Sequence, residues 1–276
     1  MEKNSITKQI VVYATLAILL IFALFPLYWM FNTSFKSNGE IYNMTPTFWP
    51  KHFTWSGYEK LLFEKNFLVN VKNSLFVSMV VAFASIIVSM LAAYAISKLQ
   101  FTGRNLISRG ILYAYLMPRA VLFIPLYMLV SAIGLNNSIW GLMIIYPTIT
   151  IPYATWMLIS YFRSIPVEIE EAAMIDGCTR ARTMWNIIFP LSAPGIAATF
   201  IFAFTLCWSE YLYALVVVTK SADKPITLGL SDMIVGDVFA WGPLMGGSIL
   251  ASIPVIIMYL FTSKYMVSGM TVGGVK

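Results

Sequence analysis

Residues 170–177 read Glu-Glu-Ala-Ala-Met-Ile-Asp-Gly (EEAAMIDG), a polar, helix-forming stretch that lies between two long apolar segments. Together with Glu168, the stretch brings three glutamates into about one helical turn. Each charge at the depth of a lipid bilayer costs several kcal/mol, so this helix cannot lie in lipid. We therefore expect it outside the bilayer, where another protein can bind it.

The composition around this stretch is that of a membrane protein. Of 276 residues, 59% are hydrophobic and only 11% are charged, with a mean hydropathy of +0.78, whereas soluble domains carry about 25% charged residues. A span needs about 20 mostly apolar residues, and strands of a β-barrel alternate over about 10 residues. We predict an all-α, polytopic membrane protein with six transmembrane helices, at residues 10–31, 72–97, 107–133, 139–161, 189–218 and 244–263.

The chain is predicted to form one transmembrane domain, residues 1–276. Its parts are an N-terminal span 10–31, an outer loop 32–71, core spans 72–263 that include an inner segment 162–188, and a C-terminal tail 264–276. Because the outer loop is long for a simple connection, we expect short helices within it.

The net charge of +6 does not indicate nucleic-acid binding. The basic residues mostly flank the apolar segments, where they determine the orientation of the spans in the membrane. With both termini in the cytoplasm, ten basic residues lie on the inner side: Lys3, Lys8, Lys98, Arg104, Arg109, Arg163, Arg180, Arg182, Lys264 and Lys276. Seven lysines lie on the outer side, and most of them fall in the long outer loop, which counts less for orientation: Lys36, Lys51, Lys60, Lys65, Lys72, Lys220 and Lys224. We predict that both termini are cytoplasmic.

The inner segment carries start and stop signals for a helix. Ser164 is expected to cap it, with Pro166 in its first turn. Gly177 occupies the position where a left-handed residue ends a helix, and Thr179 can begin a second one. Spacing at 100° per residue puts Ile169, Ala172, Ala173 and Asp176 on one side. The alternative, an amphipathic helix lying on lipid, is usually rich in Lys and Arg, so docking to a protein is favoured.

Glu171-Ala172-Ala173, three residues and then Gly177, followed by Ile187 and Pro190-Leu191, resembles the cytoplasmic signature of the membrane subunits of bacterial ABC importers. Three further stretches are similar to the carbohydrate branch, the group of the second maltose permease. They are NSL (73–75), WSEYL (208–212) and the glycine-rich tail YMVSGMTVGGVK (265–276). Ser209 and Tyr211 depart from that branch's WNEFL pattern.

The resemblance implies a type I importer permease in the bacterial inner membrane. It implies a second homologous permease, two ATPase subunits and an extracellular solute-binding protein as partners. It also implies that the signature helix is the coupling helix, with ATPase contacts at Glu168, Glu171, Ala172, Ala173, Asp176 and Gly177, of which Glu171 would pair with a basic ATPase residue. The chain has no Gly-x-x-x-x-Gly-Lys-Ser/Thr loop. We therefore expect no enzyme activity and no cofactor in this chain, with ATP and Mg bound by partners.

Arg119 and Glu210 are the ionisable residues that we expect within spans. Each is a candidate for the translocation path, since intramembrane charges mark functional sites by default. Alternatively, Arg119 has a structural role and donates hydrogen bonds to the backbone carbonyls that Pro118 leaves free. For Glu210, a role in positioning the helix is favoured. The single histidine, His52, and two cysteines, Cys178 and Cys207, cannot build an ordinary zinc site.

We predict import of a di- or oligosaccharide by alternating access. The alternative solute is anionic, such as a glycerol phosphate, a sugar phosphate or a uronic oligosaccharide, with Arg119 as the hint. A secondary transporter without an ATPase would place more ionisable groups along its spans, and a haem-bearing subunit would need histidines there.

Overall fold

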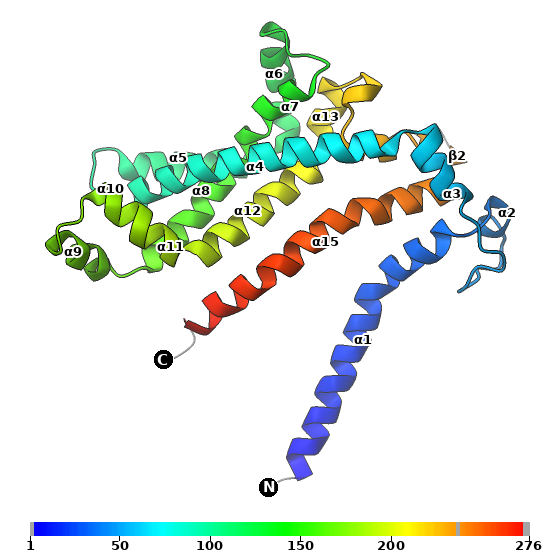
Figure 1. Ribbon diagram of the computed structural model, residues 1–276, viewed down its shortest axis with the longest axis horizontal. Coiled ribbons are helices and arrows are strands. Elements are labelled where there is room, and N and C mark those ends of the chain that lie inside the picture. Colours follow the sequence, from blue (N-terminus) through cyan, green and yellow to red (C-terminus); the bar gives the residue numbers. More distant parts are fainter. Residues whose placement is uncertain (1–2, 236–237, 273–276) are drawn as a thin grey trace. The chain divides into compact units, whose positions relative to one another are not determined.

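The computed structural model describes residues 3–235 and 238–272, with side-chain surroundings for residues 6–234 and 239–262 (Figure 1). Its α-helices are α1 (Lys3–Ser34), α2 (Asn38–Ile41), α3 (Ser56–Glu59), α4 (Phe67–Lys98), α5 (Arg104–Leu116), α6 (Arg119–Ala132), α7 (Ile139–Ile145), α8 (Pro147–Ser164), α9 (Val167–Ile175), α10 (Arg180–Thr183), α11 (Phe189–Leu191), α12 (Ala193–Trp208), α13 (Leu212–Val217), α14 (Ile226–Ser231) and α15 (Trp241–Val272). Two-residue strands, β1 (Ile234–Val235) and β2 (Val238–Phe239), pair antiparallel. The predicted all-α class is confirmed.

Within the described residues, four helical stretches are long and apolar enough to cross a membrane: Ile6–Ser34, Phe67–Lys98, Ile139–Ser164 and Trp241–Thr262. They match the first, second, fourth and sixth predicted spans. The third and fifth are broken. The helices of Arg104–Leu116 and Arg119–Ala132 meet at 98°, and those of Arg180–Leu191 and Ala193–Trp208 meet at 75°. Counting each bent pair as one span gives the predicted six.

Proline explains the break in the third span. Pro118 disfavours a helical conformation in the residue before it, and Met117 is extended, with φ −62° and ψ 133°. The sequence predicts one span at residues 107–133 that tolerates this proline, whereas the chain turns sharply there. The predicted fifth span, 189–218, is broken twice, because α12 begins after the bend at Ser192 and ends at Trp208.

The chain divides into two compact units, residues 1–68 with 230–253 and residues 69–229 with 254–276. In the first unit, Phe35 follows α1 and packs its ring against Phe53, Trp55 and Tyr58. The predicted outer loop contains α2 and α3, which confirms the expected short helices. Glu40 organises this loop: its carboxylate accepts hydrogen bonds from the Thr47 hydroxyl and the Lys51 N–H, and the Thr47 bond is the largest cause of its lowered pKa.

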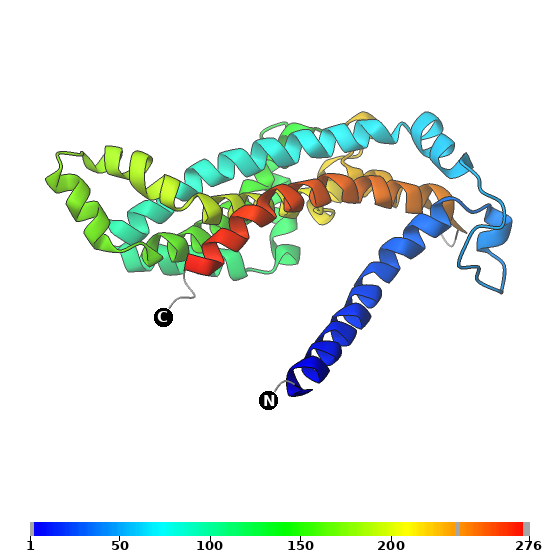
Figure 2. The same ribbon diagram turned by 60° about the horizontal axis from the view of Figure 1, so that its bottom comes forward.

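In the second unit, α8 packs against both α5 and α12. Small hydroxyl residues allow α4 to approach α8 closely: the Ser85 hydroxyl lies 2.6 Å from that of Thr150, and Ser89 donates to the Ile151 carbonyl at 3.2 Å. One apolar cluster surrounds Tyr146 and Tyr213, and a second surrounds Phe162 and Phe189. Figures 1 and 2 show α9 and α10 at one end of this unit, beyond the C-terminal ends of α4 and α8.

The contact between α8 and α12 depends on Gly195. A Cβ added there would collide with the ring of Tyr161, whereas a Cβ at Gly110 in α5 would meet open space. We expect Gly195→Ala to lower the thermal unfolding midpoint of the detergent-solubilised protein, because overpacking typically costs about 1–3 kcal/mol. Gly110→Ala is the matched control and is expected to leave the midpoint unchanged or raised, since alanine favours helix. Equal midpoints for the two variants would contradict this packing.

Candidate functional site

One face of α9 is open to solvent in the described chain. Glu168, Glu171, Ala172 and Ile175 are exposed and follow the i, i+3, i+4, i+7 spacing that lines one face of a helix. Ile175 is 86% exposed, while Ala173 is only 6% exposed. The face therefore combines two carboxylates, a small residue and an uncovered apolar side chain.

The end of α9 has the geometry that its glycine predicts. Gly177 lies in the left-handed region with φ +85°. Its N–H donates to the Met174 carbonyl (3.1 Å), and the Cys178 N–H donates to the Ala173 carbonyl (3.0 Å), as in a Schellman motif. These bonds confirm the predicted helix end and turn the chain sharply into α10.

Of the two residues that the sequence predicts as helix N-caps, one is confirmed and one is wrong. Thr179 caps α10, since its hydroxyl accepts from the Arg182 N–H at 3.3 Å. Ser164 does not cap α9. Its hydroxyl donates to the Tyr161 carbonyl within α8, and the N-cap of α9 is Pro166. The reason is that Pro166 keeps Ile165 extended (ψ 122°), which leaves Ser164 in the last turn of α8.

The opposite face of α9 is fixed to the helix bundle by a buried ion pair. Lys98 Nζ lies 2.8 Å from the Glu170 carboxylate, with the two side chains 7% and 10% exposed. Lys98 also donates to the Ile165 carbonyl at 2.8 Å, and the Tyr94 hydroxyl donates to Glu170 at 3.4 Å. The last turn of α4 thus holds both the α8–α9 junction and α9 itself.

The predicted coupling residues therefore do not all share one environment. Glu168, Glu171, Ala172, Asp176 and Gly177 are exposed, but Ala173 is buried against the bundle. Sequence spacing predicts Ala172 and Ala173 on one side of the helix, but only Ala172 is exposed. The predicted set does not include Ile175, an exposed apolar residue seven positions after Glu168, and the spacing does not indicate that Glu170 points inward.

Arg119 and Glu210 both lie at breaks in spans. Arg119 is exposed and begins α6 directly after the Pro118 break. Glu210 is 5% exposed, and its carboxylate accepts from the Tyr213 N–H (3.0 and 3.2 Å) and the Ala214 N–H (3.2 Å) at the start of α13. The Tyr213 hydroxyl donates to the Arg119 carbonyl at 3.3 Å. The two breaks are thus joined, although no ion pair between Arg119 and Glu210 occurs in the part of the chain described.

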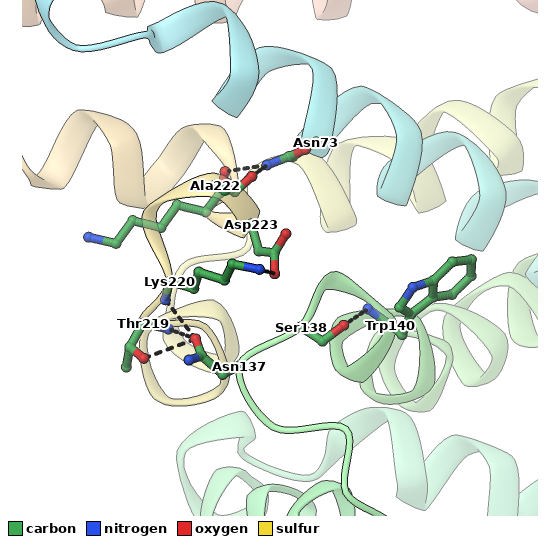
Figure 3. Close-up of polar contacts among 9 residues, drawn as sticks. Asn73, Asn137, Ser138, Trp140, Thr219, Lys220, Ala222 and Asp223 are labelled. Carbon is green, nitrogen blue, oxygen red and sulfur yellow. Dashed lines mark hydrogen bonds and ion pairs between the residues drawn. The ribbon is translucent and has the colours of Figure 1, made fainter.

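Asparagines tie down the segment that follows α13, at the N-terminal end of α4 (Figure 3). The Asn137 side-chain oxygen accepts from the N–H groups of Thr219 (2.9 Å) and Lys220 (2.6 Å). Asn73 donates to the Ala222 carbonyl at 2.8 Å, and Ser74 accepts from the Ile226 N–H at 2.7 Å. Asn73 and Ser74 are the first two residues of the NSL stretch, so in the structure this stretch holds the loop through hydrogen bonds. We call these two residues the Asn73–Ser74 clasp.

Comparisons with known proteins agree on one family. Residues 85–267 match the family model described as "Binding-protein-dependent transport system inner membrane component". An inner membrane ABC transporter permease protein of Escherichia coli, YcjP, is 35% identical over 96% of this chain and 95% of that protein. The diacetylchitobiose uptake permease DasC of Streptomyces coelicolor is 32% identical over 99% of both.

The fold is also that of a known transporter subunit. A chain from the crystal structure of a bacterial ABC transporter that imports the acidic polysaccharide alginate superposes with a TM-score of 0.79, at 23% identity, over 96% of this chain and 98% of that one. The match confirms the predicted permease fold, and the family match confirms the resemblance drawn from the Glu171–Gly177 signature. This chain belongs to the family of binding-protein-dependent transport system inner membrane components.

Proposed function

We propose that this chain is one permease subunit of an ATP-driven importer for a di- or oligosaccharide. The observation that carries the proposal is the exposed face of α9 on a chain whose relatives are named as sugar permeases, such as the diacetylchitobiose permease. In this proposal a second permease completes the transport path, two separate ATPase subunits hydrolyse ATP, and a solute-binding protein delivers the sugar from outside.

Three physical features of α9 support docking to an ATPase. Ile175 is almost fully exposed, which leaves an apolar side chain that a partner's pocket can cover. Glu171 and Glu168 lie about one and two turns before it on the same face and add negative charge, which complements a basic cleft. Ala172 allows a partner backbone to come close. A lipid surface is a poor partner for this face of α9, because helices that lie on a membrane usually present Lys and Arg to the headgroups.

The proposed topology places both termini and α9 in the cytoplasm. Short basic loops favour this orientation: Lys98 and Arg104 border the turn between α4 and α5, and Arg163, Arg180 and Arg182 flank α9. Lys276 lies outside the described residues, and the surroundings of Lys3 and Lys264 are not described. The loop held by Asn73 and Asn137 then faces the exterior, where a binding protein would dock.

Alternating access follows from differential binding. ATP must stabilise the outward-facing state more than the inward-facing one, since a ligand with equal affinity for both shifts nothing. When the ATPase dimer closes, it would draw the α9 helices of the two permeases together and rock the bundles. The breaks in the third and fifth spans leave polar backbone at membrane depth, which is tolerated where it lines a cavity or is buried in protein.

The second candidate is an anionic solute. It is favoured by the placement of Arg119, exposed at a span break, and the transporter that shares the fold imports an acidic polysaccharide. The test is uptake into proteoliposomes that hold the purified complex and ATP, with labelled neutral and uronic oligosaccharides. Uptake of neutral sugars alone supports the first proposal, and absence of ATP-dependent uptake of either class would contradict both.

Arg119→Gln separates the two candidates in the same assay. If Arg119 binds an acidic group of the solute, this variant should lower uptake of the uronic sugar by about ten-fold or more, because a charge-assisted hydrogen bond is lost. Uptake of the neutral sugar should be unchanged. Equal losses for both sugars would instead assign Arg119 a structural role at the Pro118 break.

A further inference from the structure

The three glutamates of α9 divide into two kinds. Glu168 and Glu171 point away from the bundle, whereas Glu170 points into it and is paired with Lys98 at 2.8 Å. Two nearly buried, opposite charges on separate helices hold each other, because separating them leaves an uncompensated charge away from water. Glu170 is therefore an attachment point of α9 rather than part of its exposed face.

Lys98 binds more than one partner at this corner. It is the last residue of α4, and it donates to the carbonyl of Ile165, which links α8 to α9, as well as pairing with Glu170. The Tyr94 hydroxyl, one turn earlier on α4, also reaches Glu170. Thus α4 contacts both Ile165, at the corner between α8 and α9, and α9 itself, so a shift of α9 would act on α4 through these contacts.

The other end of the same helix holds the loop after α13. Asn73 donates to the Ala222 and Lys224 carbonyls, Asn70 donates to the Lys224 carbonyl, and Ser74 accepts from the Ile226 N–H. About 38 Å of helix, at 1.5 Å per residue, separates Asn73 from Lys98. Both ends lie within one compact unit of the chain. A rigid helix anchored at both ends can carry a displacement from one to the other.

We propose that Lys98 and Glu170 are positioning residues that transmit movement of α9 through α4 to the Asn73–Ser74 clasp and its loop. The proposal rests on the proposed coupling of α9 to an ATPase, but it assigns a different task. Glu171 and Ile175 bind the partner, whereas Lys98 and Glu170 convert that binding into movement of the bundle. Loss of the pair should uncouple ATP hydrolysis from transport without detaching the ATPase.

The test compares Glu170→Gln, Lys98→Met, the double variant and the exchanged pair Glu170→Lys with Lys98→Glu, all in the complete complex. Three quantities are measured: ATPase subunits retained per permease, ATP hydrolysed, and sugar taken up. We expect Glu170→Gln to retain the ATPase and hydrolyse ATP, yet to lower the sugar imported per ATP by about ten-fold or more. The double variant should be no worse than either single one, and the exchanged pair should recover most of the coupling.

Controls keep the two proposals apart. Glu64→Gln removes an exposed carboxylate outside this unit and should leave coupling unchanged, and Lys98→Arg should retain most of it. Normal sugar per ATP in Glu170→Gln would overturn the transmission role while leaving ATPase docking intact. Loss of the ATPase in proportion to loss of transport would also overturn it, because Glu170 would then belong to the docking contact. If the single variants fail to accumulate in membranes, the exchanged pair decides: coupled transport supports the proposal, and uncoupled or absent protein contradicts it.

Discussion

Glu171→Lys is expected to abolish sugar uptake while leaving the protein in the membrane at its normal level. Glu171 is exposed at the centre of the α9 face, between Glu168 and Ile175, and it has no structural task in the described bundle that its loss would disturb. A reversed charge would meet the basic residues that we expect in the ATPase cleft. Removing one partner of a buried, hydrogen-bonded charge pair at an interface costs about 2–5 kcal/mol, which weakens binding by about thirty-fold or more.

The measurement for this variant is the amount of ATPase that co-purifies with the permease, together with uptake in intact cells. Glu64→Lys makes the same charge change at an exposed position in the outer loop and should retain both the ATPase and uptake. Ile175→Asp should fail in the same way as Glu171→Lys, since it places a charge where an apolar contact is expected. Normal ATPase recovery with Glu171→Lys would show that α9 docks through other residues.

Glu210→Leu is expected to destabilise the fifth span and to remove transport with it. Its carboxylate satisfies the first N–H groups of α13, and leucine leaves those of Tyr213 and Ala214 buried without an acceptor. Each buried, unsatisfied polar group costs about 1–3 kcal/mol. We therefore expect a clear fall in the thermal unfolding midpoint of the solubilised protein and little transport-competent complex.

Glu210→Gln is the informative companion to this variant. Glutamine keeps an oxygen that can accept from the α13 backbone, so it should retain most of the stability that leucine loses. If Glu210 only positions α13, Glu210→Gln should also retain most of the uptake. A stable Glu210→Gln protein without transport would instead place the charge of Glu210 on the translocation path. An unchanged midpoint for Glu210→Leu would contradict the role of this carboxylate as acceptor for the N–H groups of α13.

Much of this fold is predictable because lipid imposes simple rules. Long apolar runs bounded by Lys8, Lys98 and Arg104 determine where spans lie, and the glycine at 177 determines where α9 ends. The break at Pro118 has a cause that is visible in the sequence, although the sequence does not show how sharp the bend is. The break at Ser209 has no such visible cause, because WSEYL is compatible with an ordinary helix. There the Glu210 carboxylate accepts from the N–H groups that begin α13, and the Tyr213 hydroxyl donates to the carbonyl of Arg119, which only the folded chain brings near.

The directions of the α9 side chains were beyond sequence reasoning. Glu170 and Glu171 are neighbours of the same type, yet one is buried and the other exposed. That difference arises from Lys98, which lies 72 positions earlier in the chain and reaches α9 only after folding. Likewise, Ala172 and Ala173 have identical side chains but face different surroundings. Short-range spacing predicts the helix, whereas the contacts of Lys98 and Tyr94 on α4 with Glu170 decide which face of α9 remains for a partner.

The most direct test of the central claim is a gentle affinity purification of this chain from its native membranes, with the co-purifying subunits identified. The importer account predicts recovery of an ATPase and a second, related permease, and loss of the ATPase alone when Glu171 is changed to lysine. Recovery of the chain by itself, or as a homo-oligomer that transports without ATP, would contradict that account and favour a secondary transporter.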